Sequence, residues 1–324
     1  MAKAVKTIGV LTSGGDAPGM NAAIRAVVRA AINKGLKVKG IMRGYAGLLE
    51  EEIVDMESTS VSDTINKGGT ILYTARCKEF TTPEGQQQGA EICRKHGIDG
   101  IVVIGGDGSF RGARDLSQRG INCIGIPGTI DNDIACSEYT IGFDTAVNTC
   151  MQAVDRIRDT AQSHDRCSVV EVMGNNTGHL ALHSGIGCGA TCILVPEVPY
   201  DLKKDVVGRI LSYQGTGKKH FIIVVAEGTC NTNALAIQIQ ALTNIETRET
   251  VLGYIQRGGS PNAKDRVVAS QMGFRAVELL AQNIGNRVIA MKDGKIVDYD
   301  ITEALSMKKP FEMDLYNMAH DISI

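Results

Sequence analysis

The chain has 324 residues, of which 43% are hydrophobic and 22% charged, enough for two packed domains or one large one. Its 34 basic and 36 acidic side chains give a net charge of -2, which argues against a nucleic-acid or membrane-surface binder. Nine cysteines without CxxC pairs fit a reducing cytosol, and no stretch approaches the length of a membrane span. Residues 1–6 lack the apolar core of a signal peptide, so we expect a cytoplasmic protein.

Short β-branched runs alternate with amphipathic stretches, which predicts an α/β fold with mainly parallel sheets. In chain order we expect strands at 7–12, 37–41, 100–104, 121–126, 167–172, 192–195 and 221–226. The helices between and after them are predicted at 21–34, 89–96, 113–119, 145–161, about 202–211, 234–242 and 267–282. A hairpin over 288–297 should turn at Asp293 and Gly294. The alternation restarts near residue 167, so we predict two doubly wound units.

Two glycine-rich turns that follow predicted strands are candidate anion sites. Residues 13–19 (SGGDAPG) offer backbone amides ahead of a helix N-terminus, although such turns are also common structural punctuation. Residues 105–109 (GGDGS) follow an apolar strand, where Asp107 is placed to hold Mg²⁺. The alternative is that Asp107 caps the next helix.

Two further turns carry charged side chains. In residues 127–133 (PGTIDND), Asp131 and Asp133 are two positions apart, and one of them could accept a proton from an attacking hydroxyl group. A plain Asx-turn is the alternative there, and a solvated loop is the alternative for residues 256–261 (QRGGSP). Neither GxxxxGK[ST] nor a GxGxxG after the first strand occurs, which disfavours a P-loop protein and a dinucleotide enzyme.

Together these turns resemble the bacterial-type ATP-dependent 6-phosphofructokinase family. The matching segments occur in family order over essentially the whole chain: 9–21 (GVLTSGGDAPGMN), 67–70 (KGGT), 104–109 (IGGDGS), 127–133 (PGTIDND), 139–143 (YTIGF), 169–174 (VVEVMG) and 252–261 (LGYIQRGGSP). The resemblance implies two doubly wound, mainly parallel-sheet domains with the active site in the cleft between them. An ATP/Mg-binding domain would span 1–142 plus about 256–309, and a sugar-phosphate-binding domain 143–255 plus about 310–324.

The resemblance also implies roles for individual residues. Asp131 would be the general base, Thr129 and Asp133 would orient substrate and metal, Arg76 would lie near the transferred phosphate, and Asp107 would bind Mg²⁺. The implied ATP site comprises Gly15, Arg76, Cys77, Gly106, Asp107, Gly108, Ser109 and Gly112. The implied sugar-phosphate site comprises Thr129, Ile130, Asp131, Arg166, Met173, Gly174, Asn175, Glu227, Arg248, Tyr254 and Arg257. Arg166 and Arg248 would reach in from a neighbouring subunit to clamp the 6-phosphate, which implies a homotetramer.

The implied reaction is phosphorylation of fructose 6-phosphate at the C1 hydroxyl by Mg-ATP, giving fructose 1,6-bisphosphate in glycolysis. Gly108 and Gly128 stand where the pyrophosphate-using branch usually has an acidic residue and a Lys, so ATP is the expected donor. Asn175 and Tyr254 depart from the family, which has Arg and His there. These departures leave open another acceptor, such as tagatose 6-phosphate, or a weakly active regulatory or hetero-oligomeric paralogue.

The family's effector site lies between subunits and uses basic residues and a Glu. Arg25, Arg29 and Arg158 match it, and the alternative for these helical arginines is a solvated face. Three other effector positions have lost their charge, namely Ser58, Thr191 and Thr216, so we predict weak or absent effector control. His179 and His183 are spaced i, i+4 without the nearby Glu of a hydrolytic zinc pattern, and we interpret them as structural.

Overall fold

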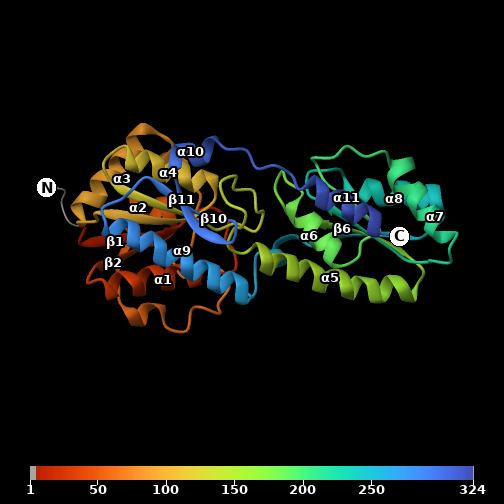
Figure 1. Cartoon of the computed structure of the whole chain (residues 1–324), viewed down its shortest axis with the longest axis horizontal. Coiled ribbons are helices and arrows are strands. Elements are labelled where there is room, and N and C mark those ends of the chain that lie inside the picture. Colours follow the sequence, from red (N-terminus) through yellow and green to blue (C-terminus); the bar gives the residue numbers. More distant parts are fainter. Residues whose placement is uncertain (1–4, 324) are drawn as a thin grey trace. The chain divides into compact units, whose positions relative to one another are not determined.

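The structure, a computed structural model, describes residues 5–323 and divides into two compact units (Figure 1). Unit 1 contains the residues up to Ile130, Ile134–Thr145 and Arg257–Lys309; unit 2 contains Asp131–Asp133, Ala146–Gln256 and the residues from Pro310. The predicted domain ranges run close to these units. Residues 1–4 and 324 lie outside the described residues, and so does most of the segment on which the absence of a signal peptide was predicted.

Unit 1 is built on a seven-stranded sheet with the order β11-β10-β5-β4-β1-β2-β3. The strands are β1 Thr7–Thr12, β2 Lys37–Ile41, β3 Ile53–Met56, β4 Gly100–Gly105, β5 Asn122–Pro127, β10 Arg287–Lys292 and β11 Lys295–Asp300. The five inner strands are parallel, and the edge strands β3 and β11 are antiparallel to their neighbours. Every residue of β1 and β4 is buried, as expected for central parallel strands covered on both faces.

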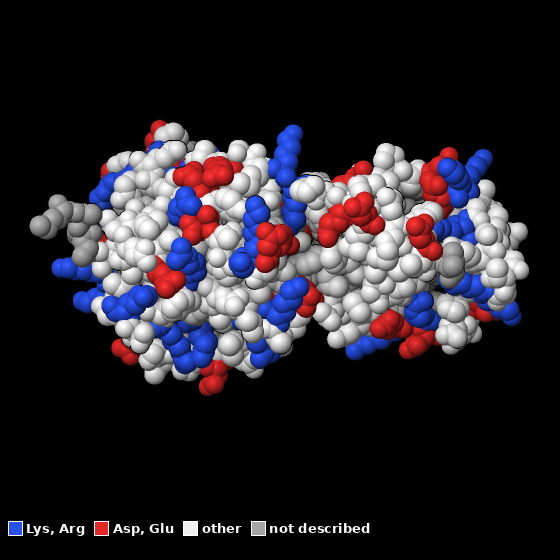
Figure 2. All heavy atoms as spheres, in the orientation of Figure 1, with Lys and Arg blue, Asp and Glu red and all other residues white. Residues whose placement is uncertain are grey.

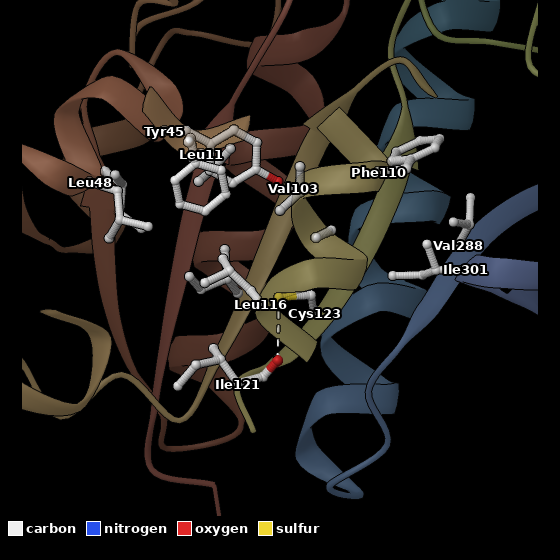
Figure 3. Close-up of a cluster of buried hydrophobic side chains, with 14 of the residues drawn as sticks. Leu11, Tyr45, Leu48, Val103, Phe110, Leu116, Ile121, Cys123, Val288 and Ile301 are labelled. Atoms are coloured by element: carbon white, nitrogen blue, oxygen red, sulfur yellow. Dashed lines mark hydrogen bonds between the residues drawn. The ribbon is translucent and has the colours of Figure 1, made fainter. Parts of the chain in front are cut away.

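Helices cover both faces of this sheet (Figure 1). The longest pair, α1 Met20–Asn33 and α9 Ala263–Ala281, pack against each other. The remaining helical segments of unit 1 are α2 Gly44–Leu49, η1 Ser58–Val61, η2 Glu79–Thr81, α3 Pro83–Lys95, α4 Asp107–Ser117 and α10 Ile301–Ser306. Between the sheet and α2, α3, α4 and α10 lies an apolar core that includes Leu11, Val103, Phe110 and Leu116 (Figure 3).

Unit 2 contains a four-stranded, fully parallel sheet with the order β7-β8-β6-β9. Its elements are α5 Phe143–Ser163 (whose first turn belongs to unit 1), β6 Cys167–Val172, α6 His179–Gly187, β7 Cys192–Leu194, η3 Leu202–Val207, α7 Gly208–Gln214, β8 Phe221–Ala226, α8 Thr232–Thr243, β9 Thr247–Val251, η4 Gly253–Gln256 and α11 Met313–Ile322. The core joins the sheet residues Phe221, Ile223 and Val225 to Ile210 of α7 and Ile239 of α8.

The α/β fold with mainly parallel sheets is confirmed, and the predicted strands occur within one or two residues of their predicted bounds. The hairpin turn is also confirmed, because Asp293 (φ 50°) and Gly294 (φ 70°) join β10 to β11. The predicted helix at 89–96 begins earlier, at Pro83, since the Thr82 hydroxyl caps it by accepting the Gly85 amide. The helix at 113–119 also begins earlier, at Asp107.

Charges of both signs are interspersed over the visible face of the molecule (Figure 2). Among residues 5–323, no helix has both the length and the apolar character needed to cross a membrane. All nine cysteines are free thiols, and Cys123, Cys167 and Cys192, which lie in or next to apolar strand runs, are buried.

Candidate functional site

The order of strands in unit 1 reverses between β1 and β4. From β1 the chain builds outward to β2 and β3, and it then returns to place β4 and β5 on the other side of β1. Open α/β sheets bind ligands outside the carboxyl ends of the strands at such a point. The turns after the two strands adjoin there, since the Ser13 amide donates to Ile104 O (3.0 Å) and the Ser109 hydroxyl donates to Ser13 O (3.0 Å). The structure therefore brings together the predicted residues Gly15, Gly106, Asp107, Gly108 and Ser109.

Glycines at this edge serve different purposes. A Cβ on Gly105 would lie 2.3 Å from Ser13 O, so the two turns can adjoin only with Gly there. A Cβ on Gly112 would lie 2.6 Å from the Tyr45 ring, whose hydroxyl donates to Ser109 O (2.6 Å). Gly112 thus allows α4 to pack on Tyr45. A Cβ on Gly108 would meet no atom within 4 Å, so this exposed position leaves space for a ligand.

Asp107 lies at the carboxyl end of β4, where the metal ligand was predicted. The competing interpretation made it a helix cap, but the N-cap position of α4 is occupied by Gly106. Asp107 is the first helical residue and is exposed. An accessible carboxylate beside a glycine-rich turn is the type of oxygen donor that Mg²⁺ takes in kinase sites, so this residue fits the ion.

Asn21, which the sequence analysis did not single out, holds the loop that carries Arg76 and Cys77 against the start of α1. Asn21 is 1% exposed; its Nδ2 donates to Lys67 O (3.0 Å) and Gly68 O (3.2 Å), and its Oδ1 accepts the Ile71 amide (2.8 Å). The Thr74 hydroxyl then donates to Gly14 O (2.8 Å). The sequence offered one signal for this role, because Asn21 is a polar residue at the start of a predicted helix and lies within the matched segment 9–21.

Arg257, predicted to contact the sugar, lies in unit 1 beside the first glycine turn. Its guanidinium Nη1 would be 3.0 Å from a Cβ built on Gly15. The turn of residues 256–261, which carries Arg257, also touches the loop that Asn21 holds. A Cβ on Gly68 would lie 2.3 Å from Gly259 O, and the Ser260 hydroxyl donates to Asn66 O (2.8 Å). The glycine-rich turns 13–19, 105–109 and 256–261 thus meet at one edge of the sheet.

The third turn, residues 127–133, is joined to this edge by its first residues. The Gly128 amide donates to Gly105 O (3.0 Å), the Ile141 amide donates to Pro127 O (2.9 Å), and the Thr140 hydroxyl donates to Thr129 O (2.6 Å). Segment 139–143, identified in the sequence only as a family match, therefore braces the turn. A Cβ on Gly128 would lie 3.1 Å from Met20 and 3.2 Å from Ile104, so a Lys there would require these side chains to shift by a few tenths of an ångström.

A second missed residue, Asp265, anchors that brace. It is fully buried in α9 and accepts hydrogen bonds from the Tyr139 hydroxyl (2.5 Å), the Gly142 amide (2.7 Å) and the Thr145 amide (2.9 Å). Burial raises the pKa of Asp265, although these hydrogen bonds oppose the rise. No sequence pattern marked it, because its partners lie more than a hundred residues away along the chain.

Asp131 to Asp133 belong to unit 2. Asp131 and Asp133 are partly buried, and Asn132 adopts a left-handed conformation (φ 50°), which Asn tolerates better than most residues. The Thr177 hydroxyl lies 3.4 Å from Asp131 O and 2.9 Å from Gly174 O. This hydroxyl links the turn of the predicted base to the turn after β6.

The carboxyl edge of the second sheet gathers the predicted sugar contacts. Met173, Gly174 and Asn175 follow β6, Glu227 follows β8, and Tyr254 follows β9. The Glu227 Oε1 accepts the amides of Gly174 (3.3 Å) and Asn175 (2.6 Å). Tyr254 is 79% exposed.

Arg166 and Arg248 lie at the opposite edge of the same sheet. Arg166 directly precedes β6, and Arg248 is the second residue of β9. Both pair with Glu246, at 2.9 Å from Arg166 Nε and 2.7 Å from Arg248 Nη2. The six residues of β6, at about 3.3 Å each, place them about 20 Å from Met173. Unit 2 therefore does not bring all of the predicted sugar-phosphate residues together.

The predicted effector residues are divided between the units. Arg25 and Arg29 lie on α1 in unit 1, and Arg158 lies on α5 in unit 2. Partial burial, and then the charge of Arg158, lower the pKa values of Lys218 and His220.

The two histidines interpreted as structural join α6 to the segment before α11. Glu312 Oε2 lies 2.9 Å from His183 Nε2 and 3.6 Å from His179 Nδ1. The adjacent imidazoles of His179 and His183 hold the pKa of Glu312 well below its usual range.

Sequence comparison with known proteins gives one family. The family model for phosphofructokinase matches residues 7–280. ATP-dependent 6-phosphofructokinases of Clostridium botulinum (strain Hall) and Thermoanaerobacter sp. (strain X514) are 55% and 56% identical to this chain over 319 and 322 residues. These matches cover 98% and 99% of this chain and 100% of each relative.

Solved structures agree with the sequence comparison. Phosphofructokinase from Saccharomyces cerevisiae matches with a TM-score of 0.88 at 34% identity, over 98% of this chain and 48% of the yeast chain, so this chain spans about half of that protein. Pyrophosphate-dependent phosphofructokinase from Marinobacter aquaeolei matches with a TM-score of 0.85 at 23% identity, over 96% of this chain and 86% of that chain. The latter likeness concerns the fold alone.

Proposed function

The chain belongs to the phosphofructokinase family, and from this premise we propose that it transfers the γ-phosphoryl group of ATP to the C1 hydroxyl of fructose 6-phosphate, a step of glycolysis. The observation that carries the proposal is the meeting of the turns after β1, β4 and β5 at the switch point of the first sheet. Each turn supplies one part of a phosphoryl-transfer site, namely backbone amides, a metal-binding carboxylate and a base.

In unit 1, backbone amides of the first two turns and the N-terminus of α4 would bind the ATP phosphates. Asp107 would hold Mg²⁺, which, when bound, neutralises charge on the β- and γ-phosphate oxygens. Arg76, which is exposed on the loop held by Asn21, would stabilise the charge that develops on the transferred group. Unit 1 is thereby proposed as the ATP/Mg-binding domain.

Asp131 would accept the proton of the C1 hydroxyl as that oxygen attacks the γ-phosphorus. Thr129 and Asp133, on the same turn, would orient the acceptor and the metal. The transfer is direct and in line, and it forms no covalent enzyme intermediate. Positioning and electrostatics would supply the catalysis.

Unit 2 is proposed as the sugar-phosphate-binding domain, with Glu227, Met173 and Gly174 near the sugar. Arg166 and Arg248 lie at the far edge of the sheet from these residues, which supports their serving the site of a neighbouring chain. We therefore propose a homotetramer, and a cytoplasmic one in keeping with glycolysis. Because Ser58, Thr191 and Thr216 lack charge, we expect effector control to be weak, and a several-fold shift of sugar affinity by ADP would contradict this.

An ADP-release assay over a panel of sugar phosphates tests the proposal. We expect turnover with fructose 6-phosphate and a loss of about 10²–10⁴-fold in kcat for Asp131→Asn, the usual contribution of a general base. Unchanged turnover in this variant would refute the assignment. Preferred turnover of tagatose 6-phosphate would indicate the other acceptor, and a folded oligomer with no turnover on any sugar would indicate the regulatory paralogue.

A further inference from the structure

A fully buried side-chain amide lies beneath the sugar-binding turn of unit 2. Gln256, the last residue of η4, is 0% exposed. Its Oε1 accepts hydrogen bonds from the Met173 amide (3.0 Å) and from the Cys150 thiol (3.1 Å), and its Nε2 donates to Gly253 O (2.9 Å). One side chain therefore ties together the turn after β6, the helix α5 and its own turn after β9.

The turn that Gln256 holds has an unusual backbone. Gly174 has φ 152° and Asn175 has φ 57°, and both of their amides donate to Glu227 Oε1. The amide just before them, that of Met173, donates to Gln256. Sparsely populated backbone conformations persist only where the surrounding structure fixes them. The amides of residues 173–175 are thus fixed by two side chains, Gln256 and Glu227. Glu227 is also a predicted sugar contact.

We infer that Gln256 is a positioning residue for the sugar phosphate. It acts through Met173 on the turn 173–175 and through Gly253 on the turn that carries Tyr254. Its complete burial keeps it from touching the substrate itself. The inference rests on the proposed function, because it concerns the same sugar site.

Substitution by Met tests the inference. Gln256→Met keeps the length of the side chain but leaves the Met173 amide without its acceptor. We expect the KM for fructose 6-phosphate to rise about tenfold or more, as for a buried donor left unpaired. The KM for ATP should stay within about twofold, because the predicted ATP residues are held by a different set of side chains in unit 1.

Two further variants separate positioning from stability. Gln256→Glu keeps an acceptor for the Met173 amide, so the rise in the KM for the sugar should be smaller than in Gln256→Met. Ser184→Ala is the matched control, since it removes another fully buried side-chain hydrogen bond of unit 2, to Leu180 O (2.6 Å). It should lower stability without changing either KM.

Three outcomes overturn the inference: an unchanged KM for the sugar in Gln256→Met, an equal rise in both KM values, or the same rise in Ser184→Ala. Should Gln256→Met fail to fold, Gln256→Glu decides, and no selective rise in the KM for the sugar would refute the inference. Hydrogen exchange of the 174 and 175 amides is a readout independent of turnover. Faster exchange in the Gln256 variant than in Ser184→Ala supports positioning even if the chain phosphorylates no fructose 6-phosphate, and equal exchange overturns it.

Discussion

The two units distribute their predicted ligand residues differently. In unit 1, the predicted ATP residues lie on turns that converge on the carboxyl edge of the sheet, around the β1/β4 switch point. In unit 2, Met173 and Glu227 lie at the carboxyl edge, whereas Arg166 and Arg248 lie at the amino edge beside Glu246. We therefore propose that one chain assembles the ATP residues by itself, whereas a second chain completes the sugar-phosphate set.

The units are alike in how they hold the loops that carry these residues. Asn21 in unit 1 and Gln256 in unit 2 are buried amides that bond to the backbone of a segment next to a site. A primary amide suits this task, because it donates and accepts at once and carries no charge into the interior. Differences between the units should therefore appear in oligomer-dependent tests rather than in local ones.

Mixing inactive subunits tests the division of the sugar site with the largest expected effect. Asp131→Asn would remove the proposed base, and Arg248→Ala would remove a proposed phosphate contact worth about 1.5–3 kcal/mol. In a mixed oligomer, some sites would combine an intact Asp131 from one chain with an intact Arg248 from another. We expect activity well above the sum of the two separate variants, measured after co-refolding.

A second mixture of two variants serves as the control for this experiment. Asp131→Asn mixed with Asp133→Asn places both lesions on one turn, so no mixture can rebuild an intact site. Recovery in this control, or no recovery in the first mixture, would contradict an arginine supplied by the neighbouring chain.

The second-largest expected effect is that of a carboxylate at position 108 on the KM for ATP. Gly108 has no atom within 4 Å of its missing Cβ and no positive φ, so Gly108→Asp should fold normally. A negative charge beside the ATP phosphates should raise the KM for ATP at least about tenfold, since like charges brought together cost several kcal/mol. Gly108→Ala separates charge from size and should leave the KM for ATP nearly unchanged. An equal effect of Ala and Asp would mean that space, rather than charge, decides.

The sequence predicted local features of both units better than contacts between distant segments. Apolar strands and the glycine turns that follow them are local patterns, so the strand ends carrying Asp107 and Asp131 were found from the chain alone. Sites that depend on distant partners were missed: Asp265 bonds to residues 120 or more positions away, and Gln256 bonds to Met173 at a separation of 83. Short or half-exposed elements such as β9 also escaped, since their burial pattern lacks a clear period.

A smaller effect is expected at Asn175, where the family has Arg. The residue is exposed and left-handed (φ 57°), a conformation that costs a non-Gly, non-Asn residue roughly 1–2 kcal/mol. A charge-assisted phosphate contact contributes about 1.5–3 kcal/mol, so Asn175→Arg should raise kcat/KM by only a few-fold. Asn176→Arg adds the same charge one residue later and should give no gain. No gain from Asn175→Arg would dissociate this position from the transferred phosphate.

The smallest expected effect concerns the C-terminal helix of unit 2. Arg209 donates to His320 Nδ1 (2.7 Å) and to His320 O (2.6 Å), and because Arg only donates, Nδ1 must be unprotonated. Partial burial, and then Arg209, lower the pKa of His320 below its usual 6.5. The folded state thus binds fewer protons than the unfolded state, so this contact contributes fully above about pH 6.5 and is lost as the pH falls below it.

Hydrogen exchange of the α11 amides, corrected for intrinsic rates, should therefore show more opening at pH 5.5 than at pH 7.5. His320→Gln offers an acceptor that does not titrate, so the pH dependence of opening should be smaller than in the wild type while the helix stays docked. The His183–Glu312 ion pair just before α11 also requires a charged imidazole, so the difference between the two proteins, rather than the wild type alone, measures the Arg209 contact. Equal pH dependence in the wild type and His320→Gln would show that Arg209 does not control the docking of α11.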